Sequence, residues 1–179
     1  MGSYKEIEGN LITLAKSGTF DVIAHGCNCF CTMGAGIAPQ MAYNFGADNL
    51  PLEDDVYAGD IDKLGRIDCM GLIDRKKDVH FSDIENAKKG DLVIVNAYTQ
   101  YGFGRNHEGG SQIPLDYEAL TLCMRKMNVV FKGKHIGLPY VIGCGLAGGD
   151  EQRVLKIIKE ELKDMDITMV QLPQNVKNN

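Results

Sequence analysis

The sequence lacks the features that mark membrane-spanning, secreted and polynucleotide-binding proteins. No apolar run approaches the roughly 20 residues that a membrane-spanning helix requires. Residues 1–6 contain no apolar core of the kind found in a secretory signal. The longest basic cluster is residues 75–77 and the net charge is −5, so long nucleic-acid tracts are poor candidate partners. We therefore expect a cytoplasmic protein whose ligand, if it is a nucleotide, is a single small one.

Two common phosphate-binding motifs are also missing. The P-loop pattern G-x-x-x-x-G-K-[ST] does not occur, and a G-x-G-x-x-G pattern that starts at Gly34 would need glycine where Pro39 stands. These absences argue against a P-loop nucleotidase and against a dinucleotide-binding Rossmann site.

The cysteines do not have the spacing of a zinc site. There are six: Cys27, Cys29, Cys31, Cys69, Cys123 and Cys144. The C-x-C-x-C run at residues 27–31 has neither the usual C-x₂₋₄-C spacing nor a second knuckle to complete four ligands. We expect reduced, structural thiols, with a metal or redox role as the alternative. We expect neither a bound metal nor a cofactor.

What is present is the pattern of an α/β fold. At 179 residues, 44% of them hydrophobic, the chain is most simply one domain spanning residues 1–179. Short apolar segments alternate with helical patterns, which predicts a layered α/β architecture. The expected strands cover residues 4–8, 21–24, 66–72, 91–98, 135–138 and 168–172. The expected helices cover residues 36–45, 115–126 and 151–162. Residues 49–64 are acidic and less periodic, and we expect a loop with some helix there.

Two glycine-rich junctions, at residues 21–38 and 135–150, each lead from a short apolar segment into an expected helix. In the first, His25 ends the strand and Gly34 and Gly36 leave the backbone open to a ligand. The second contains the run of mostly small residues at 143–149. Backbone N–H groups at such a turn favour phosphate. The pair of junctions therefore predicts a diphosphate held between two loops.

Three further observations combine along the chain: the segments at residues 9–11, residues 25–28 leading to 34–38, and residues 138–139 with 142–146. In these segments and in their order, the chain resembles the macrodomain family of ADP-ribose-binding modules. The resemblance implies a three-layer α/β/α sandwich with a mixed central sheet. It also implies that ADP-ribose lies in a cleft across the top of the sheet.

The resemblance further implies a set of binding residues. Asn10 stands where the family usually has an aspartate that contacts the adenine amino group. Leu11 would pack on the adenine, and Asn28 would face the distal ribose. The diphosphate would be held on one side by Gly34, Ala35, Gly36 and Ile37, and on the other by Gly143, Cys144, Gly145, Leu146 and Ala147.

Within the family, residues 25–29 look like the branch containing the yeast-type ADP-ribose 1''-phosphate phosphatase. This implies that the protein hydrolyses the terminal phosphate of ADP-ribose 1''-phosphate, with His25 as general base toward water. Asp150 would orient His25, or would simply cap the helix that follows it. The alternative for His25 is a structural role, in which a buried imidazole satisfies the hydrogen bond of a neighbouring polar group.

Two other functions remain open at this point. One is a non-catalytic reader that binds ADP-ribose or an ADP-ribosylated protein. The other is an ADP-ribosyl-protein glycohydrolase, a branch that uses a lysine and an aspartate. By approximate alignment these positions hold Gly71 and Ala147 in this chain, which counts against the glycohydrolase.

Overall fold

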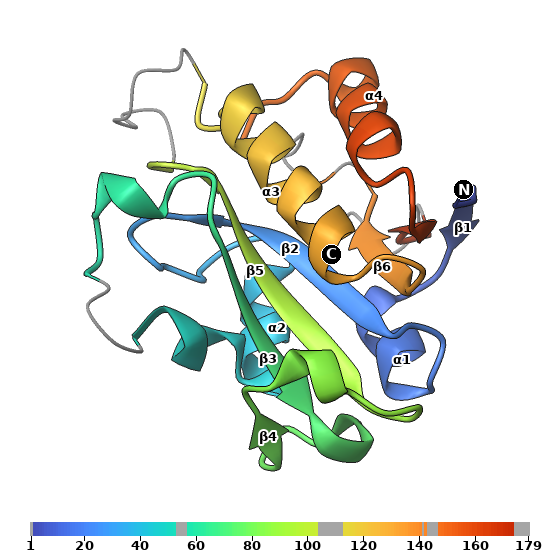
Figure 1. Ribbon diagram of the computed structural model, residues 1–179. Coiled ribbons are helices and arrows are strands. Elements are labelled where there is room, and N and C mark those ends of the chain that lie inside the picture. The colour runs from blue at the N-terminus through green and yellow to red at the C-terminus, as the bar shows by residue number, and fades with distance from the viewer. Residues whose placement is uncertain (1, 53–56, 104–112, 141, 143–146, 174–179) are drawn as a thin grey trace.

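A seven-stranded sheet with helices on both faces forms the centre of the protein in the computed structural model (Figure 1), which describes residues 2–52, 57–103, 113–140, 142 and 147–173. The strands, in sheet order, are β1 (Tyr4–Glu8), β7 (Asp166–Gln171), β6 (His135–Pro139), β2 (Val22–Asn28), β5 (Leu92–Gln100), β3 (Ile67–Leu72) and β4 (His80–Phe81).

The sheet is mixed, as the resemblance to macrodomains implies. Strands β1, β7, β6, β2 and β5 run parallel, whereas β3 is antiparallel to β5 and β4 is antiparallel to β3. The carboxyl ends of the five parallel strands therefore lie along one edge, here called the carboxyl edge. In open α/β sheets this is the edge where ligands bind.

Helices cover the two faces in pairs. The α1 (Leu11–Lys16) and α2 (Ala38–Phe45) helices lie on one face, and α3 (Tyr117–Val130) and α4 (Glu151–Glu161) on the other. Alternation along β2 produces this division, because Val22 and Ala24 pack with α3 and α4 while Ile23 packs with α1 and α2. The three-layer α/β/α sandwich is confirmed.

The elements that pattern analysis missed are short. Helix α1 has six residues and β4 has two, so both are shorter than the stretches over which hydrophobic periodicity can be recognised. Strand β2 runs on to Asn28, four residues beyond the expected end, and so includes His25. Short 3₁₀ turns occupy Ala47–Leu52, Ile61–Lys63, Ile73–Arg75 and Ile84–Asn86. In the described part of the chain, no helix has the length and apolar character needed to cross a membrane.

Candidate functional site

The strand order brings the predicted binding segments to the carboxyl edge. Asn10 follows β1, residues 29–37 follow β2, and residues 140–150 follow β6, and all three strands are parallel. Segments far apart in sequence therefore share one edge of the sheet. Gly143, Cys144, Gly145 and Leu146 lie outside the described residues.

The loop after β2 begins with a turn that Asn28 closes on itself. The Asn28 amide nitrogen donates to the carbonyl and the hydroxyl oxygen of Thr32, at 3.2 and 2.9 Å, and its amide oxygen accepts from the Thr32 N–H at 3.3 Å. Asn28 is 8% exposed. Its amide thus shapes the loop that leads to the glycines, a role the sequence alone did not suggest.

Residues 34–37 present open backbone at the start of α2. Gly34 and Gly36 are exposed, and a side chain added at either would meet nothing within 4 Å. Gly36 has φ +63°, in the left-handed region that favours glycine. No hydrogen bond joins the N–H groups of residues 34–37 to another described residue. These donors are therefore available to a ligand.

The N-terminus of α2 is also uncapped. Ile37 occupies the cap position and makes no side-chain hydrogen bond, and the first turn has no acidic residue. In α1, α3 and α4 the caps are Asn10, Asp116 and Asp150, each of which accepts from a backbone N–H of its helix. Among the described α-helices, α2 thus combines free N–H groups with the positive end of a helix dipole. An anion is the natural partner for that combination.

At the end of β1, the two residues predicted to meet adenine differ in exposure. Asn10 is exposed, and its amide oxygen accepts from the Thr13 N–H at 3.1 Å as the cap of α1. That oxygen keeps a second lone pair. Leu11 is 4% exposed and packs toward Gly137, where an added Cβ would lie 2.9 Å from its Cδ1. Its side chain is therefore part of the core.

On the far side of the edge, Ala147 and Asp150 have main-chain partners. The Ala147 carbonyl accepts from the Leu115 N–H at 3.0 Å. The Asp150 carboxylate accepts from the Arg153 N–H at 2.9 Å, and the Asp150 N–H donates to the Tyr117 hydroxyl oxygen at 2.8 Å. The geometry is that of the helix cap, the second of the two roles considered for Asp150.

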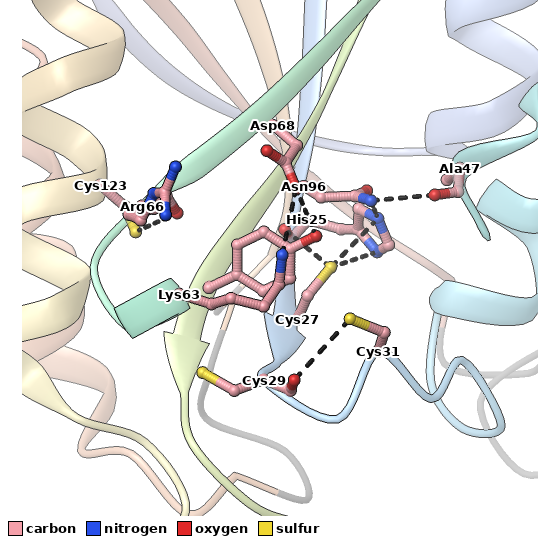
Figure 2. Close-up of polar contacts among 11 residues, drawn as sticks. His25, Cys27, Cys29, Cys31, Ala47, Lys63, Arg66, Asp68, Asn96 and Cys123 are labelled. Atoms are coloured by element: carbon pink, nitrogen blue, oxygen red, sulfur yellow. Dashed lines mark hydrogen bonds and ion pairs between the residues drawn. The ribbon is translucent and has the colours of Figure 1, made fainter. Parts of the chain in front are cut away.

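His25 lies inside the sheet, fully buried, and belongs to a short chain of hydrogen bonds (Figure 2). Its Nε2 is 2.7 Å from the Asn96 amide oxygen, and the Asn96 amide nitrogen donates to the Ala47 carbonyl at 2.9 Å. Because that amide oxygen only accepts, the proton of the imidazole must be on Nε2. The thiol of Cys27 lies 3.5 Å from the same nitrogen.

Burial keeps the His25 imidazole neutral. It lowers the pKa from 6.5 to about 4, against a smaller opposing effect of the hydrogen bond to Asn96. No contact joins His25 to Asp150 among the described residues. No contact thus brings the two predicted catalytic residues together, and each has the structural kind of partner that was the alternative to its catalytic role.

The described cysteines are free thiols, and most are buried. The thiols are those of Cys27, Cys29, Cys31, Cys69 and Cys123. Burial raises the pKa of the Cys29, Cys69 and Cys123 thiols to about 12, which keeps them protonated and unreactive. Within the described ranges, no group of three or more histidine, cysteine or acidic side chains is arranged to hold a metal ion.

A buried lysine stands beside these thiols, in the segment expected to be an acidic loop. Lys63 is 3% exposed; its ammonium lies 3.4 Å from the Asp68 carboxylate and 4.0 Å from the centre of the Tyr98 ring. The Tyr98 hydroxyl donates to the same carboxylate at 2.7 Å. The triad ties the 3₁₀ turn at Ile61–Lys63 to β3 and β5. Sequence analysis did not predict it, because the spacing of Lys63 and Asp68, five residues apart, matches no helical or strand period, and Tyr98 lies far along the chain.

Solved structures with the same architecture define the class of fold. The macrodomain of Mycobacterium tuberculosis DarG is 17% identical, with a TM-score of 0.60; the match covers 97% of this chain and 100% of that one. A Trypanosoma brucei macrodomain, solved in complex with ADP-ribose, is 14% identical with a TM-score of 0.58; the match covers 98% of this chain and 66% of that one. The protein has the macrodomain fold.

Sequence comparison identifies a relative of this chain. No family model matches the sequence. An uncharacterised 17.5 kDa protein in the tk-vs intergenic region of Enterobacteria phage T4 is 30% identical over 174 residues, and the match covers 93% of this chain and 94% of the phage protein. The chain belongs to the same family as this phage protein.

Proposed function

We propose that the protein binds ADP-ribose along the carboxyl edge of its sheet. The observation that carries the proposal is the uncapped N-terminus of α2, with the unpaired N–H groups of residues 34–37 in front of it. The Trypanosoma brucei macrodomain, which shares the fold, was solved with ADP-ribose bound. A diphosphate supplies the anionic oxygens that such a site favours.

In this proposal the ligand lies along the carboxyl edge, with its adenosine toward β1 and its terminal ribose toward β5. The diphosphate contacts residues 34–37 from the side of β2 and residues 143–147 from the side of β6. The adenosine lies toward β1, where the Asn10 amide oxygen has a lone pair free for the adenine amino group. The terminal ribose lies toward Asn28 and β5. An ADP-ribosylated protein would enter from that end.

The proposed function stops at binding. Hydrolysis of ADP-ribose 1''-phosphate requires a base that reaches water, and His25 is fully buried with Asn96 as its partner. A phosphate-release assay with ADP-ribose 1''-phosphate, run on the parent protein and on His25→Gln, decides between binding alone and hydrolysis. Release that depends on His25 would extend the proposal to catalysis.

The glycohydrolase alternative has no support at the described positions. Ala147 supplies no carboxylate, and Gly71 pairs with Val93, near the start of β5. At about 3.3 Å per residue, that point is roughly 20 Å from the carboxyl edge. A side chain at Gly71 would also overlap the ring of Phe81, which lies 2.2 Å from an added Cβ. The approximate alignment of the lysine with Gly71 therefore does not identify a site position.

Titration calorimetry with ADP-ribose tests the proposal, and two glycines offer a matched pair of variants. Gly36 and Gly133 have φ of +63° and +80°, and neither has an atom within 4 Å of an added Cβ. Alanine at either position costs about 1 kcal/mol in backbone strain. Gly36→Ala also places a methyl group in the ligand loop, so we expect at least about a tenfold loss of affinity there.

Gly133→Ala, in the turn after α3, serves as the control and should bind ADP-ribose like the parent. Equal affinity of the two variants would contradict the placement of the diphosphate. Absence of binding by the parent protein would remove the proposed function altogether.

A further inference from the structure

Three aromatic rings meet at the ends of β2 and β5. Phe30 follows β2, and Tyr101 and Phe103 follow β5. The Phe30 ring packs edge-to-face on Tyr101, with centroids 5.1 Å apart, and on Phe103, with centroids 6.1 Å apart. These three residues are called the aromatic platform below.

The aromatic platform is held rigidly from below. The Tyr101 hydroxyl donates to the Gly59 carbonyl at 2.7 Å, and an added Cβ at Gly59 would lie 3.1 Å from the Phe30 ring. The Cys29 N–H donates to the Tyr101 carbonyl at 2.9 Å. Phe30 and Tyr101 are half-buried, whereas Phe103 is 53% exposed. Two of the three rings are therefore anchored, and the exposed Phe103 ring packs on them at the carboxyl edge.

The strand order places the aromatic platform at one end of the proposed ligand. Along the edge, β1 is followed by β7, β6, β2 and β5. The proposed diphosphate contacts lie after β2, with the adenosine toward β1. The aromatic platform lies on the opposite side, beyond the terminal ribose. It faces whatever group is attached to C1'' of that ribose.

The charges around the aromatic platform favour a cation over an anion. Lys63, the cation packed on Tyr98 near the end of β5, is already paired with Asp68. Asp60 follows Gly59 directly and is a carboxylate beside Tyr101's hydrogen-bond partner. Among the residues that the structure describes, an added phosphate would find no free cation in these contacts. A flat cationic ring would find aromatic faces, which attract positive charge.

We infer that the site accepts NAD⁺, with its nicotinamide ring, a planar cation attached to C1'' of the terminal ribose, packed against the aromatic platform. The inference rests on the proposed function, including the direction in which the ligand lies. The pyridinium adds aromatic stacking and charge attraction to the contacts that ADP-ribose already makes. NAD⁺ is bound as a ligand, with no chemical step.

Calorimetry with NAD⁺ and with ADP-ribose, on the same protein, tests the inference. We expect NAD⁺ to bind about fivefold more tightly than ADP-ribose, a factor typical of one stacking contact. Phe103→Leu keeps apolar bulk but removes the ring, and should abolish the preference while leaving ADP-ribose affinity unchanged. Phe103→Tyr keeps the ring and should retain the preference. Val129→Ala, 75% exposed on α3, controls for the loss of an exposed apolar group.

The outcomes separate this inference from the proposed function. Binding of ADP-ribose with no preference for NAD⁺ would overturn the inference alone. An equal loss of affinity for both ligands in Phe103→Leu would mean that adenine occupies the aromatic platform, and would overturn the inference together with the ligand's direction. Failure of the parent protein to bind either ligand would overturn both the inference and the proposed function.

Discussion

The buried imidazole of His25 makes the stability of the protein depend on pH. Its pKa is about 4 in the folded protein and near 6.5 when unfolded, so the unfolded chain binds the proton more readily. The stability that His25 contributes is therefore complete above pH 6.5 and is lost as the pH falls toward 4. We expect urea unfolding to show a loss of about 2–3 kcal/mol between pH 7.5 and 4.5 from this residue.

His25→Gln removes the titration and is the comparison for that measurement. Its free energy of unfolding should vary less over the same pH range than that of the parent, whatever its absolute value. The same slope in both proteins would mean that another group is responsible.

A second residue-scale prediction concerns two buried threonines. The Thr99 hydroxyl, near the carboxyl end of β5, is fully buried and has no hydrogen-bond partner among the described residues. The Thr168 hydroxyl, 1% exposed in β7, is 2.8 Å from His135 Nε2. Valine has the same shape without the hydroxyl, so Thr99→Val should raise the free energy of unfolding by about 1 kcal/mol.

Thr168→Val is the counterpart with the opposite sign. It breaks a hydrogen bond that exists and should lower stability by about 1 kcal/mol. Chemical denaturation of both variants measures the difference. A loss of stability in Thr99→Val comparable to that in Thr168→Val would show that the Thr99 hydroxyl has a partner in solution.

At the scale of the element, helix caps distinguish structural from catalytic carboxylates. Asp150 caps α4 through the Arg153 N–H. Asp150→Ala should lower stability by about 1 kcal/mol, as should Asp116→Ala in α3, because each loses the same kind of cap. Asp150→Asn keeps an amide oxygen and should remain as stable as the parent.

Ligand affinity is the second readout for this carboxylate. Asp150→Asn and the parent should bind ADP-ribose equally and release phosphate from ADP-ribose 1''-phosphate at equal rates, because the carboxylate does not contact His25. A large fall in phosphate release in Asp150→Asn, with stability intact, would assign Asp150 a part in catalysis.

At the scale of the whole molecule, periodic patterns sufficed for the layers of the fold but not for side-chain partners. The β-branched run in β5 and the apolar stripe of α4 are local, so spacing alone predicts both elements. The order of strands puts Asn10, the loop after β2 and Ala147 at one edge, and the resemblance to macrodomains anticipated that grouping. The two-residue β4 is too short to leave a pattern.

The Asn96 partner of His25 and the Tyr98 partner of Lys63 depend on contacts between segments far apart in sequence. Asn96 is 71 residues from His25 in sequence but faces it because β2 and β5 pair in register. A histidine at this position is buried if its strand continues past it and exposed if the strand ends there. Strand β2 continues to Asn28, so His25 lies in the middle of the strand and is buried. Long-range pairing of this kind leaves no trace in spacing or composition.

The direction of the outermost parallel strands decides how the protein is best attached to a surface or a fusion partner. Strands β1 and β7 pair in parallel, from Tyr4 opposite Ile167 to Glu8 opposite Gln171. The chain therefore enters the sheet at the edge opposite the proposed ligand and leaves β7 on the ligand's own side. An affinity tag, fluorophore or immobilising group joined ahead of β1 starts from the remote edge. The Gln171 carbonyl at the end of β7 accepts from the Gly9 N–H, so a group joined directly after β7 would start beside Asn10 and compete with the proposed ligand for space.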